Sequence, residues 1–170
     1  MIHARSGLAM PALPQKTDLK EQLARALAAD LSVRERAHRA ASEAATHAEA
    51  KPENDKDTRA LEQSYLAHGE ARRVEELRAA LVNVEAMAVR AFGEHDAVVL
   101  GALVTTDEGG ARTLLWIAPH GGGSRLAGGL VQVVTPRSPL GQALIGKRAG
   151  DECSVSLAGR ERVLTIVAVA

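Results

Sequence analysis

The sequence predicts an α+β protein in which an N-terminal antiparallel helical hairpin precedes a small β-rich domain with one short helix. Residues 16–90 are rich in Ala, Leu, Arg and Glu and hold one glycine, whereas residues 93–170 hold thirteen of the fifteen glycines and most of the valines. Apolar residues recur at helical spacing in the first part and in short β-branched runs in the second. We therefore expect a flexible tail at 1–15, a hairpin at 16–91 and a second domain at 93–170.

The two helices of the hairpin are each predicted by an apolar stripe. Thr17 or Asp18 can cap the start of the first helix. Its stripe consists of leucines at four-residue steps, continued by alanines: Leu19, Leu23, Leu27, Leu31, Ala37, Ala41, Ala44 and Ala48. The second helix carries a heptad-like seam of Ala60, Ala67, Ala71, Val74, Leu77, Leu81, Val84 and Ala88. Because both stripes shrink to alanine away from the second domain, two helices of about 45 Å can pack as a slim coiled coil.

An acidic segment at 49–59, Glu-Ala-Lys-Pro-Glu-Asn-Asp-Lys-Asp-Thr-Arg, joins the two helices. Pro52 cannot continue the first helix, so the chain is expected to turn here. Asn54 or Asp55 can cap the second helix, and Asp57 is expected in its first turn, beside the positive end of the helix dipole. The segment is thus predicted to form an acidic tip far from the second domain. Taken alone, such a cluster most often marks a solvated turn.

The second domain is predicted as short strands at 97–105, 113–117, 130–134, 153–157 and 163–169. Ser138 followed by Pro139 is typical of a helix start, and this short helix should run to Leu144. A last group of residues is expected in the core of the domain: Trp116, Leu140, Leu144, Ile145 and Cys153.

Composition excludes several classes of function. Lys+Arg and Asp+Glu both number 21, and this neutral balance argues against a free-standing nucleic-acid-binding protein. Cys153 is the only cysteine, so neither a disulfide framework nor a cysteine zinc cluster is expected. The apolar runs are too short to span a membrane, and residues 1–14 do not read as a secretory signal. We expect a monomer in a reducing cytoplasm.

Residues 138–152 read Ser-Pro-Leu-Gly-Gln-Ala-Leu-Ile-Gly-Lys-Arg-Ala-Gly-Asp-Glu. This block resembles the C-terminal motif of the Gre transcription elongation factors, and Glu53-Asn54 resembles the Glu-Asn of the Gre tip. The order of hairpin and β-rich domain is also that of the Gre factors. The resemblance implies an FKBP-like fold for residues 93–170. It also implies that this domain docks on bacterial RNA polymerase, that the hairpin enters the secondary channel, and that contact with RNA is indirect.

The resemblance further implies that the protein is a co-catalytic accessory factor of the polymerase, which cleaves backtracked transcripts, and not itself an enzyme. Hydrolysis of a phosphodiester benefits from two metals, and Mg²⁺ needs only one or two protein carboxylates. No cofactor of the chain's own is expected, only the Mg²⁺ of the polymerase active site. The implied co-catalytic acids are Glu53, Asp55 and Asp57, with Glu53 and Asp55 as metal ligands inside the complex. The implied partner-binding residues are Asn54, Ser138, Pro139, Leu140 and Gly141.

One departure from the Gre pattern keeps a second function open. The Gre tip has an aspartate three residues before its Glu-Asn, where this chain has Ala50. Glu49, Asp55 or Asp57 can substitute for it. Otherwise the protein enters the channel and modulates the polymerase without stimulating cleavage. A third candidate, a prolyl isomerase, is disfavoured because its apolar pocket is lined largely by aromatic residues, and this chain has only three.

Overall fold

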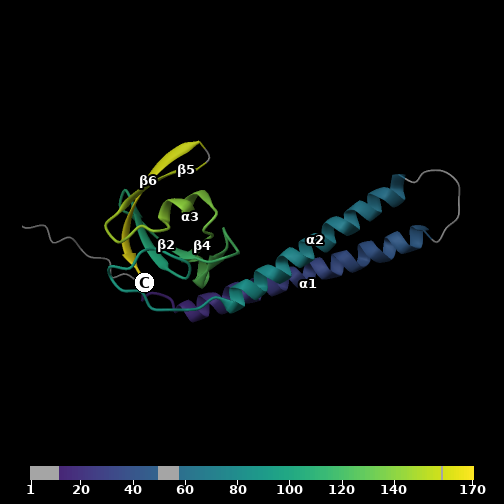
Figure 1. Ribbon diagram of the computed structural model, residues 1–170, viewed down its shortest axis with the longest axis horizontal. Helices are drawn as coiled ribbons and strands as arrows, with labels where there is room; N and C mark the ends of the chain where they lie inside the picture. Colours follow the sequence, from purple (N-terminus) through teal and green to yellow (C-terminus); the bar gives the residue numbers. More distant parts are fainter. Residues whose placement is uncertain (1–11, 50–57, 158) are drawn as a thin grey trace, which may run out of the picture.

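The computed structural model describes residues 12–49, 58–157 and 159–170. It confirms the predicted α+β fold, with two long helices followed by a mixed sheet that carries one short helix (Figure 1). The helices are α1 (Lys16–Glu49), α2 (Thr58–Ala86) and α3 (Pro139–Leu144), with a short 3₁₀ turn at Ala127–Gly129. The strands are β1 (Leu103–Glu108), β2 (Ala111–Ile117), β3 (Arg125–Leu126), β4 (Val131–Val134), β5 (Glu152–Leu157) and β6 (Arg160–Val169).

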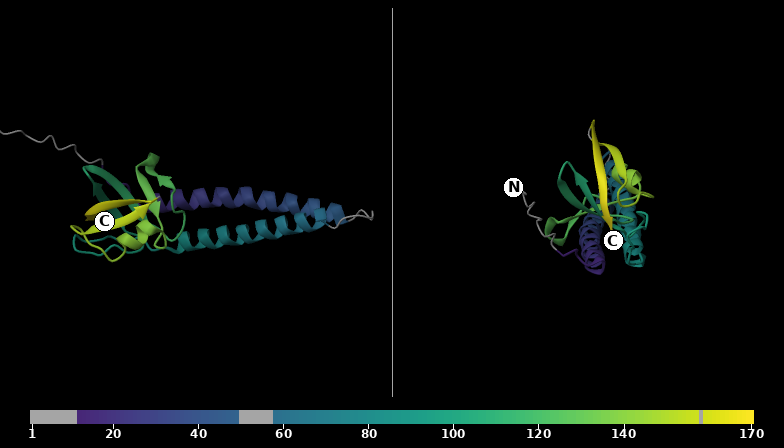
Figure 2. Two further views of the ribbon diagram at one scale, coloured as in Figure 1. Left: turned by 90° about the horizontal axis from the view of Figure 1, so that it is seen from above. Right: turned by 90° about the vertical axis from the view of Figure 1, so that its left-hand side faces the viewer.

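Helices α1 and α2 lie side by side as an antiparallel hairpin that projects from the sheet (Figure 2). The start of α1 differs from the prediction, because the helix begins at Lys16 and its first turn contains Thr17 and Asp18. Asp18 therefore acts through its charge near the positive helix end and not as a cap. Helix α1 ends at Glu49, three residues before Pro52. No described helix is long and apolar enough to cross a bilayer.

The sheet has six strands in the order β3-β4-β2-β1-β6-β5. Strands β2 and β4 pair in parallel, and the other neighbours are antiparallel. Gly109 and Gly110 both have positive φ and form the tight turn between β1 and β2, as a two-residue hairpin requires. The strand predicted at 97–105 is wrong in its first part, because β1 begins only at Leu103.

Each face of the sheet has its own core, since successive side chains of a strand point to opposite faces. Leu103, Leu114 and Trp116 face the base of the hairpin, where they pack with Leu19 and Leu23 of α1 and with residues of α2. On the other face, a second core gathers residues of β1, β2, β5 and β6 around Leu144 of α3: Val104, Leu115, Ile117, Cys153, Val155, Leu164 and Ile166. The sheet therefore lies between the base of the hairpin and α3, which fixes the hairpin to the β-rich domain.

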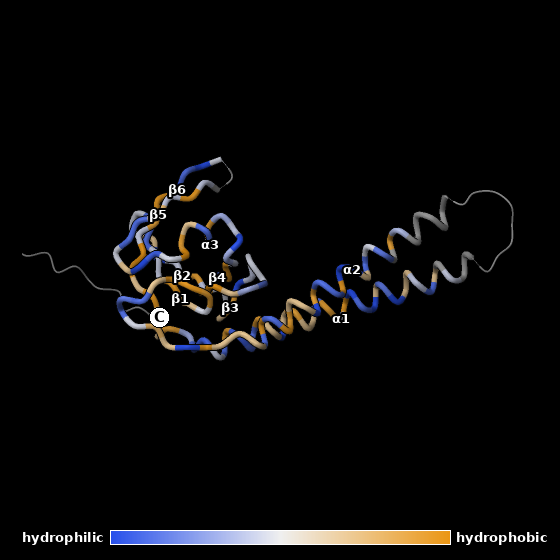
Figure 3. The backbone as a smooth tube through the Cα atoms, viewed as in Figure 1, coloured by the Kyte–Doolittle hydropathy of each residue, from blue (hydrophilic) through white to orange (hydrophobic). Residues whose placement is uncertain are grey.

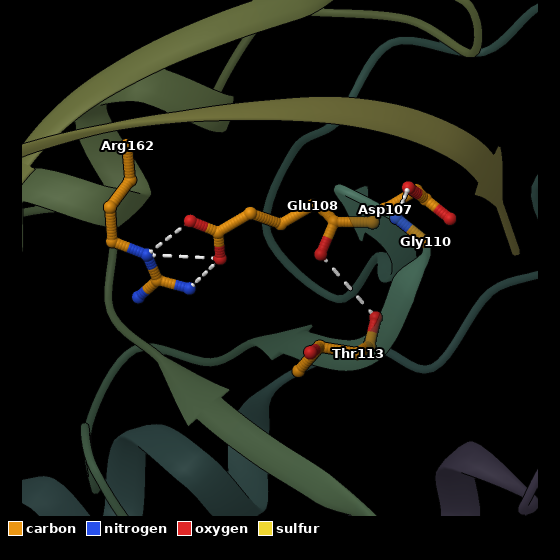
Figure 4. A network of polar contacts seen from close by, with 6 residues as sticks. Asp107, Glu108, Gly110, Thr113 and Arg162 are labelled. Carbon is orange, nitrogen blue, oxygen red and sulfur yellow. Dashed lines mark hydrogen bonds and ion pairs between the residues drawn. The ribbon is translucent and has the colours of Figure 1, made fainter.

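An exposed ion pair joins the outer ends of β1 and β6 (Figure 4). The guanidinium of Arg162 donates to both carboxylate oxygens of Glu108, with Nε at 2.8 Å from Oε1 and 3.0 Å from Oε2. The hydrogen bonds from Arg162 lower the pKa of Glu108 below its usual value. Next to the pair, Asp107 accepts a hydrogen bond from the backbone N–H of Gly110 at 2.9 Å and so supports the β1–β2 turn.

Candidate functional site

Four predicted site residues, Glu53, Asn54, Asp55 and Asp57, fall in residues 50–57, outside the described residues. We call this stretch the apex segment. It joins Glu49 to Thr58, the ends of α1 and α2 that lie far from the sheet (Figure 1). The predicted capping roles of Asn54 and Asp55 therefore remain predictions, and the described part of α2 has no acidic residue in its first turn. Within the described ranges, no group of three His, Cys, Asp or Glu residues could hold a metal.

The other four predicted site residues form the start of α3. The Ser138 hydroxyl accepts a hydrogen bond from the Gly141 N–H at 3.1 Å and donates one to the Thr135 carbonyl at 2.8 Å. Gly141 is buried, and a Cβ at this position would lie 2.0 Å from the Thr135 carbonyl oxygen. Ser138 and Gly141 thus seat α3 tightly on the turn that precedes it. Ser138 and Gly141 of the motif thus have a structural role within the domain, whether or not a partner binds there.

The surface that α3 offers to a partner comes from neighbouring apolar residues. Pro139 is exposed, and Leu140 is half-buried against the core of that face. Ile145 is 38% exposed, so its expected place in the core is wrong, whereas Leu144 is fully buried. Contact of Ser138, Pro139, Leu140 and Gly141 with a partner remains a prediction. Of these four residues, Pro139 and Leu140 have side chains that a partner could contact directly.

A groove of about 570 Å³ lies between the start of α3 and the base of the hairpin. We call it the base groove. Its lining combines α2 of the hairpin with loops of the β-rich domain: Asn83, Leu100, Pro119, His120, Gly121, Thr135, Pro136 and Arg137. Leu100 is 43% exposed in it. The groove therefore presents both parts of the protein on one concave surface.

Two hydrogen bonds cross the joint between the hairpin and the β-rich domain. Gln22 Oε1 of α1 accepts from the Ala127 N–H at 2.8 Å, and Asn83 Nδ2 of α2 lies 3.0 Å from His120 Nε2. Sequence reasoning missed both pairs and found no role for His120. The bonded residues are 105 and 37 positions apart, and no local pattern in the sequence signals such pairs.

Lysines of α1 hold the end of α2. Lys20 Nζ donates to the Met87 carbonyl at 2.9 Å, and Lys16 Nζ donates to the Arg90 carbonyl. Lys16 also lies over the Phe92 ring, with its Nζ 4.5 Å from the centroid, while the Arg90 guanidinium lies 4.1 Å from it. Burial, and then the charge of Arg90, lower the pKa of Lys16 below its usual value. These contacts tie the start of α1 to the chain that leaves the hairpin.

Beyond the base, the seam of the hairpin differs from the predicted alanine stripe. Ala37 and Ala44 are exposed, whereas Arg34, His38 and Ser42 are half-buried. Ion pairs cross this outer seam: Arg34 with Glu70 at 3.4 Å and Arg78 with Glu35 at 2.6 Å, and Arg78 also bonds Glu75 within α2. Hydrogen bonding to Glu35 and the charge of Glu75 raise the pKa of Arg78.

The comparison with protein families concerns the β-rich domain. Residues 94–170 match the family model described as "Transcription elongation factor, GreA/GreB, C-term". The β-rich domain is therefore similar to the C-terminal domain of the GreA/GreB factors. Factors of the GreA/GreB family bind RNA polymerase and act as accessory proteins. No curated protein sequence matches the chain.

The solved structures that match the chain include GreA factor homolog 1 (Gfh1) of Thermus thermophilus, at 18% identity and a TM-score of 0.39, over 86% of this chain and 94% of that one. Gfh1 of Thermus aquaticus is 20% identical with a TM-score of 0.39, over 91% and 95%. GreA/GreB of Nitrosomonas europaea is 20% identical with a TM-score of 0.37, over 57% and 78%.

Proposed function

We propose that this protein binds bacterial RNA polymerase, inserts its helical hairpin into the secondary channel and promotes cleavage of backtracked transcripts. The observation that carries the proposal is the position of the far ends of α1 and α2, at Glu49 and Thr58, between which the apex segment lies in the sequence. In the described part of the chain, the hairpin packs on the β-rich domain at its base, and the other ends of α1 and α2 lie away from the domain that matches the GreA/GreB family model.

The length of the free part of the hairpin supports insertion into a channel. Leu27 is the outermost residue of α1 in the core shared with the sheet. From Leu27 to Glu49, the helix rises about 33 Å at 1.5 Å per residue. The outer seam uses small or polar residues such as Ala41, Ser42 and Ala71 at half-buried positions. Small side chains keep this part slim enough to enter a narrow opening.

The β-rich domain offers a docking surface at the root of the hairpin. Pro139, Leu140 and Ile145 provide apolar contact area, and the base groove adjoins them through Thr135. A partner held here would contact the hairpin through Asn83 as well. The proposed docking surface thus lies directly beside the root of the hairpin that is proposed to insert.

The apex segment has the chemistry that cleavage requires. Glu53, Asp55 and Asp57 can supply hard oxygen ligands, and one or two carboxylates suffice for Mg²⁺ held mainly by another protein. A second metal ion would then assist the attack of water on the RNA backbone. We assign Glu53 as the principal ligand and Asp55 as the second, with Asp57 as a further acid and Asn54 as a contact residue.

The second candidate function is channel binding that modulates or blocks transcription without cleavage. Ala50 favours this second function, because it stands where Gre tips carry an aspartate, three residues before Glu-Asn. The two candidates share docking and insertion and differ only in what the apex segment does.

The deciding experiment uses a backtracked elongation complex with labelled RNA. The wild-type protein should stimulate shortening of the transcript, and Glu53→Ala should abolish this while binding to the polymerase stays unchanged. Glu43→Ala is the matched control, because Glu43 is an exposed acid of α1 within the described part of the hairpin. Equal cleavage by the wild type and Glu53→Ala would defeat the assignment of Glu53. Binding without any cleavage by the wild type would favour the modulator.

A further inference from the structure

A small change of angle at the joint between the hairpin and the β-rich domain would move the far end of α1 by a much larger distance than the base. The helical part of α1 from Leu23 to Glu49 rises about 39 Å at 1.5 Å per residue. A tilt of about 1.5° at Leu23 would therefore move Glu49 by about 1 Å, and a misplacement of that size can lower a catalytic rate by about a hundredfold. The function proposed above thus requires a joint that holds one direction closely.

The shared apolar core alone does not supply that direction. Leu19, Leu23 and Leu27 face Leu103, Leu114 and Trp116 across the joint. Apolar burial is non-directional, and cores tolerate repacking with small shifts. Hydrogen bonds, by contrast, weaken steeply when their angle changes. Polar pairs at the rim of this core are the contacts that can distinguish one tilt from another.

The loop after β2 contacts both helices of the hairpin. His120 bonds Asn83 of α2, while the next residue, Gly121, lies against Leu23 of α1. A Cβ on Gly121 would be only 2.5 Å from Leu23 Cδ1, and Gly121 has a φ of +79°. The loop therefore touches both helices at adjacent positions, and a tilt of either helix would break or compress one of these contacts.

The pair of Gln22 and Ala127 holds α1 at a second, separate place. Ala127 has a φ of +51°, a conformation that residues with a side chain rarely adopt. Its N–H is bonded by Gln22 in a half-buried site. Loss of that acceptor would leave a polar group unpaired and a strained turn unsupported. The two helices are thus each bonded to a different loop of the sheet.

We propose that Gln22 and Asn83 are positioning residues that fix the direction of the hairpin relative to the β-rich domain. They act through Ala127 and His120 and touch neither RNA nor metal. The proposal rests on the proposed function for its biological role. Its physical content, a fixed hairpin direction, can be measured on the protein alone.

The test measures the distance between the hairpin and the β-rich domain by double electron–electron resonance. Spin labels are attached at Glu43→Cys in α1 and Glu161→Cys in β6, which are both exposed. Cys153→Ala removes the buried native thiol. Gln22→Met with Asn83→Leu should at least double the width of the distance distribution or shift its mean. A tilt of 10° at Leu23 moves position 43 by about 5 Å.

Conservative variants provide the matched control. Gln22→Glu keeps an oxygen acceptor for the Ala127 N–H, and Asn83→Asp can accept a hydrogen bond from His120 once the ring carries its proton on Nε2, so this pair should retain the wild-type distribution. In the polymerase assay, Gln22→Met with Asn83→Leu should lower the effect about tenfold or more when both proteins are measured at saturating concentration, where a change in affinity has no influence. Gln22→Glu with Asn83→Asp should restore that effect.

A distance distribution that is unchanged in Gln22→Met with Asn83→Leu would overturn the proposal, as would equal broadening in the conservative pair. These outcomes are independent of the function proposed above. If the wild type does not bind polymerase, that function fails, while the distance measurement still decides whether Gln22 and Asn83 fix the direction of the hairpin.

Discussion

The base and the outer part of the hairpin are built in different ways. At the base, Leu19 and Leu23 of α1 and Val84 of α2 are fully buried against the sheet. Farther out, the seam contains the half-buried Arg34 and His38 as well as the buried Val74, and ion pairs are added to the apolar contacts. In the tube coloured by hydropathy, hydrophobic and hydrophilic residues alternate along both helices of the hairpin (Figure 3).

This difference separates two tasks within one pair of helices. The base contributes the free energy that attaches the hairpin and the contacts that set its direction. The outer part contributes reach, and it is stabilised mainly by the pairing of α1 with α2. Exposed ion pairs contribute about 0–1 kcal/mol each, so this part is only weakly stabilised by them. Substitutions in the two parts should therefore have very different effects on stability.

The largest effect is expected for Leu23→Ala at the base. Leu23 is fully buried, and deletion of a buried leucine side chain typically costs about 2–5 kcal/mol. Urea unfolding followed by circular dichroism measures the loss. The matched control in the outer part is Val33→Ala, because Val33 is 52% exposed and should change stability by less than about 0.5 kcal/mol. Similar losses in both variants would break the distinction between base and outer part.

A smaller effect of opposite sign is expected for Gly69→Ala in the outer part of α2. Gly69 lies in the helix, is exposed, and a Cβ there would meet nothing within 4 Å. Alanine is favoured over glycine in a helix by about 1 kcal/mol, so the hairpin should become more stable. Hydrogen exchange of α2 amides near position 69 should slow, with little change in the sheet. Faster exchange there would contradict an outer part stabilised mainly by its own helices.

The smallest effect is expected for the exposed pair of Glu108 and Arg162, away from the hairpin. The pKa of Glu108 is lower in the folded chain than its usual value of 4.5, because Arg162 bonds the charged form. The pair therefore stabilises the fold above about pH 4.5, and this contribution is lost as pH falls through the lower folded-state pKa. Glu108→Gln should reduce the dependence of stability on pH in that window. An unchanged pH profile would show that the pair contributes nothing.

The elements that follow from local patterns were predicted well. The leucines at 19, 23 and 27 do form the buried face of α1, and Ser138 with Pro139 does start α3. The alanine stripe failed at Ala37 and Ala44, which lie six and thirteen residues after Leu31, because at 100° per residue both point about 120–140° away from it. The buried face instead passes through Arg34, His38 and Ala41, at alternating steps of three and four.

The contacts that need tertiary structure could not be predicted. Residues 97–102 form an apolar run, yet Val98 bonds Lys147 and Gly146 outside any strand. The apolar sequence indicates that this segment is buried, but it does not indicate which residues its backbone bonds. Likewise, Gln22 and Asn83 are ordinary polar residues on helices until the fold brings Ala127 and His120 to them. The candidate acids of the apex segment came from the resemblance, and they lie outside the described residues.

The central claim is that the apex segment reaches the polymerase active site, close to the RNA 3′ end, while the β-rich domain binds the outer surface of the polymerase. A photo-crosslinking amino acid at Asn54 tests it directly in a backtracked complex with labelled RNA. We predict a crosslink to the 3′ part of the RNA from position 54 and none from Val33, which lies nearer the base. Bound protein that crosslinks from neither position, or equally from both, would contradict the account.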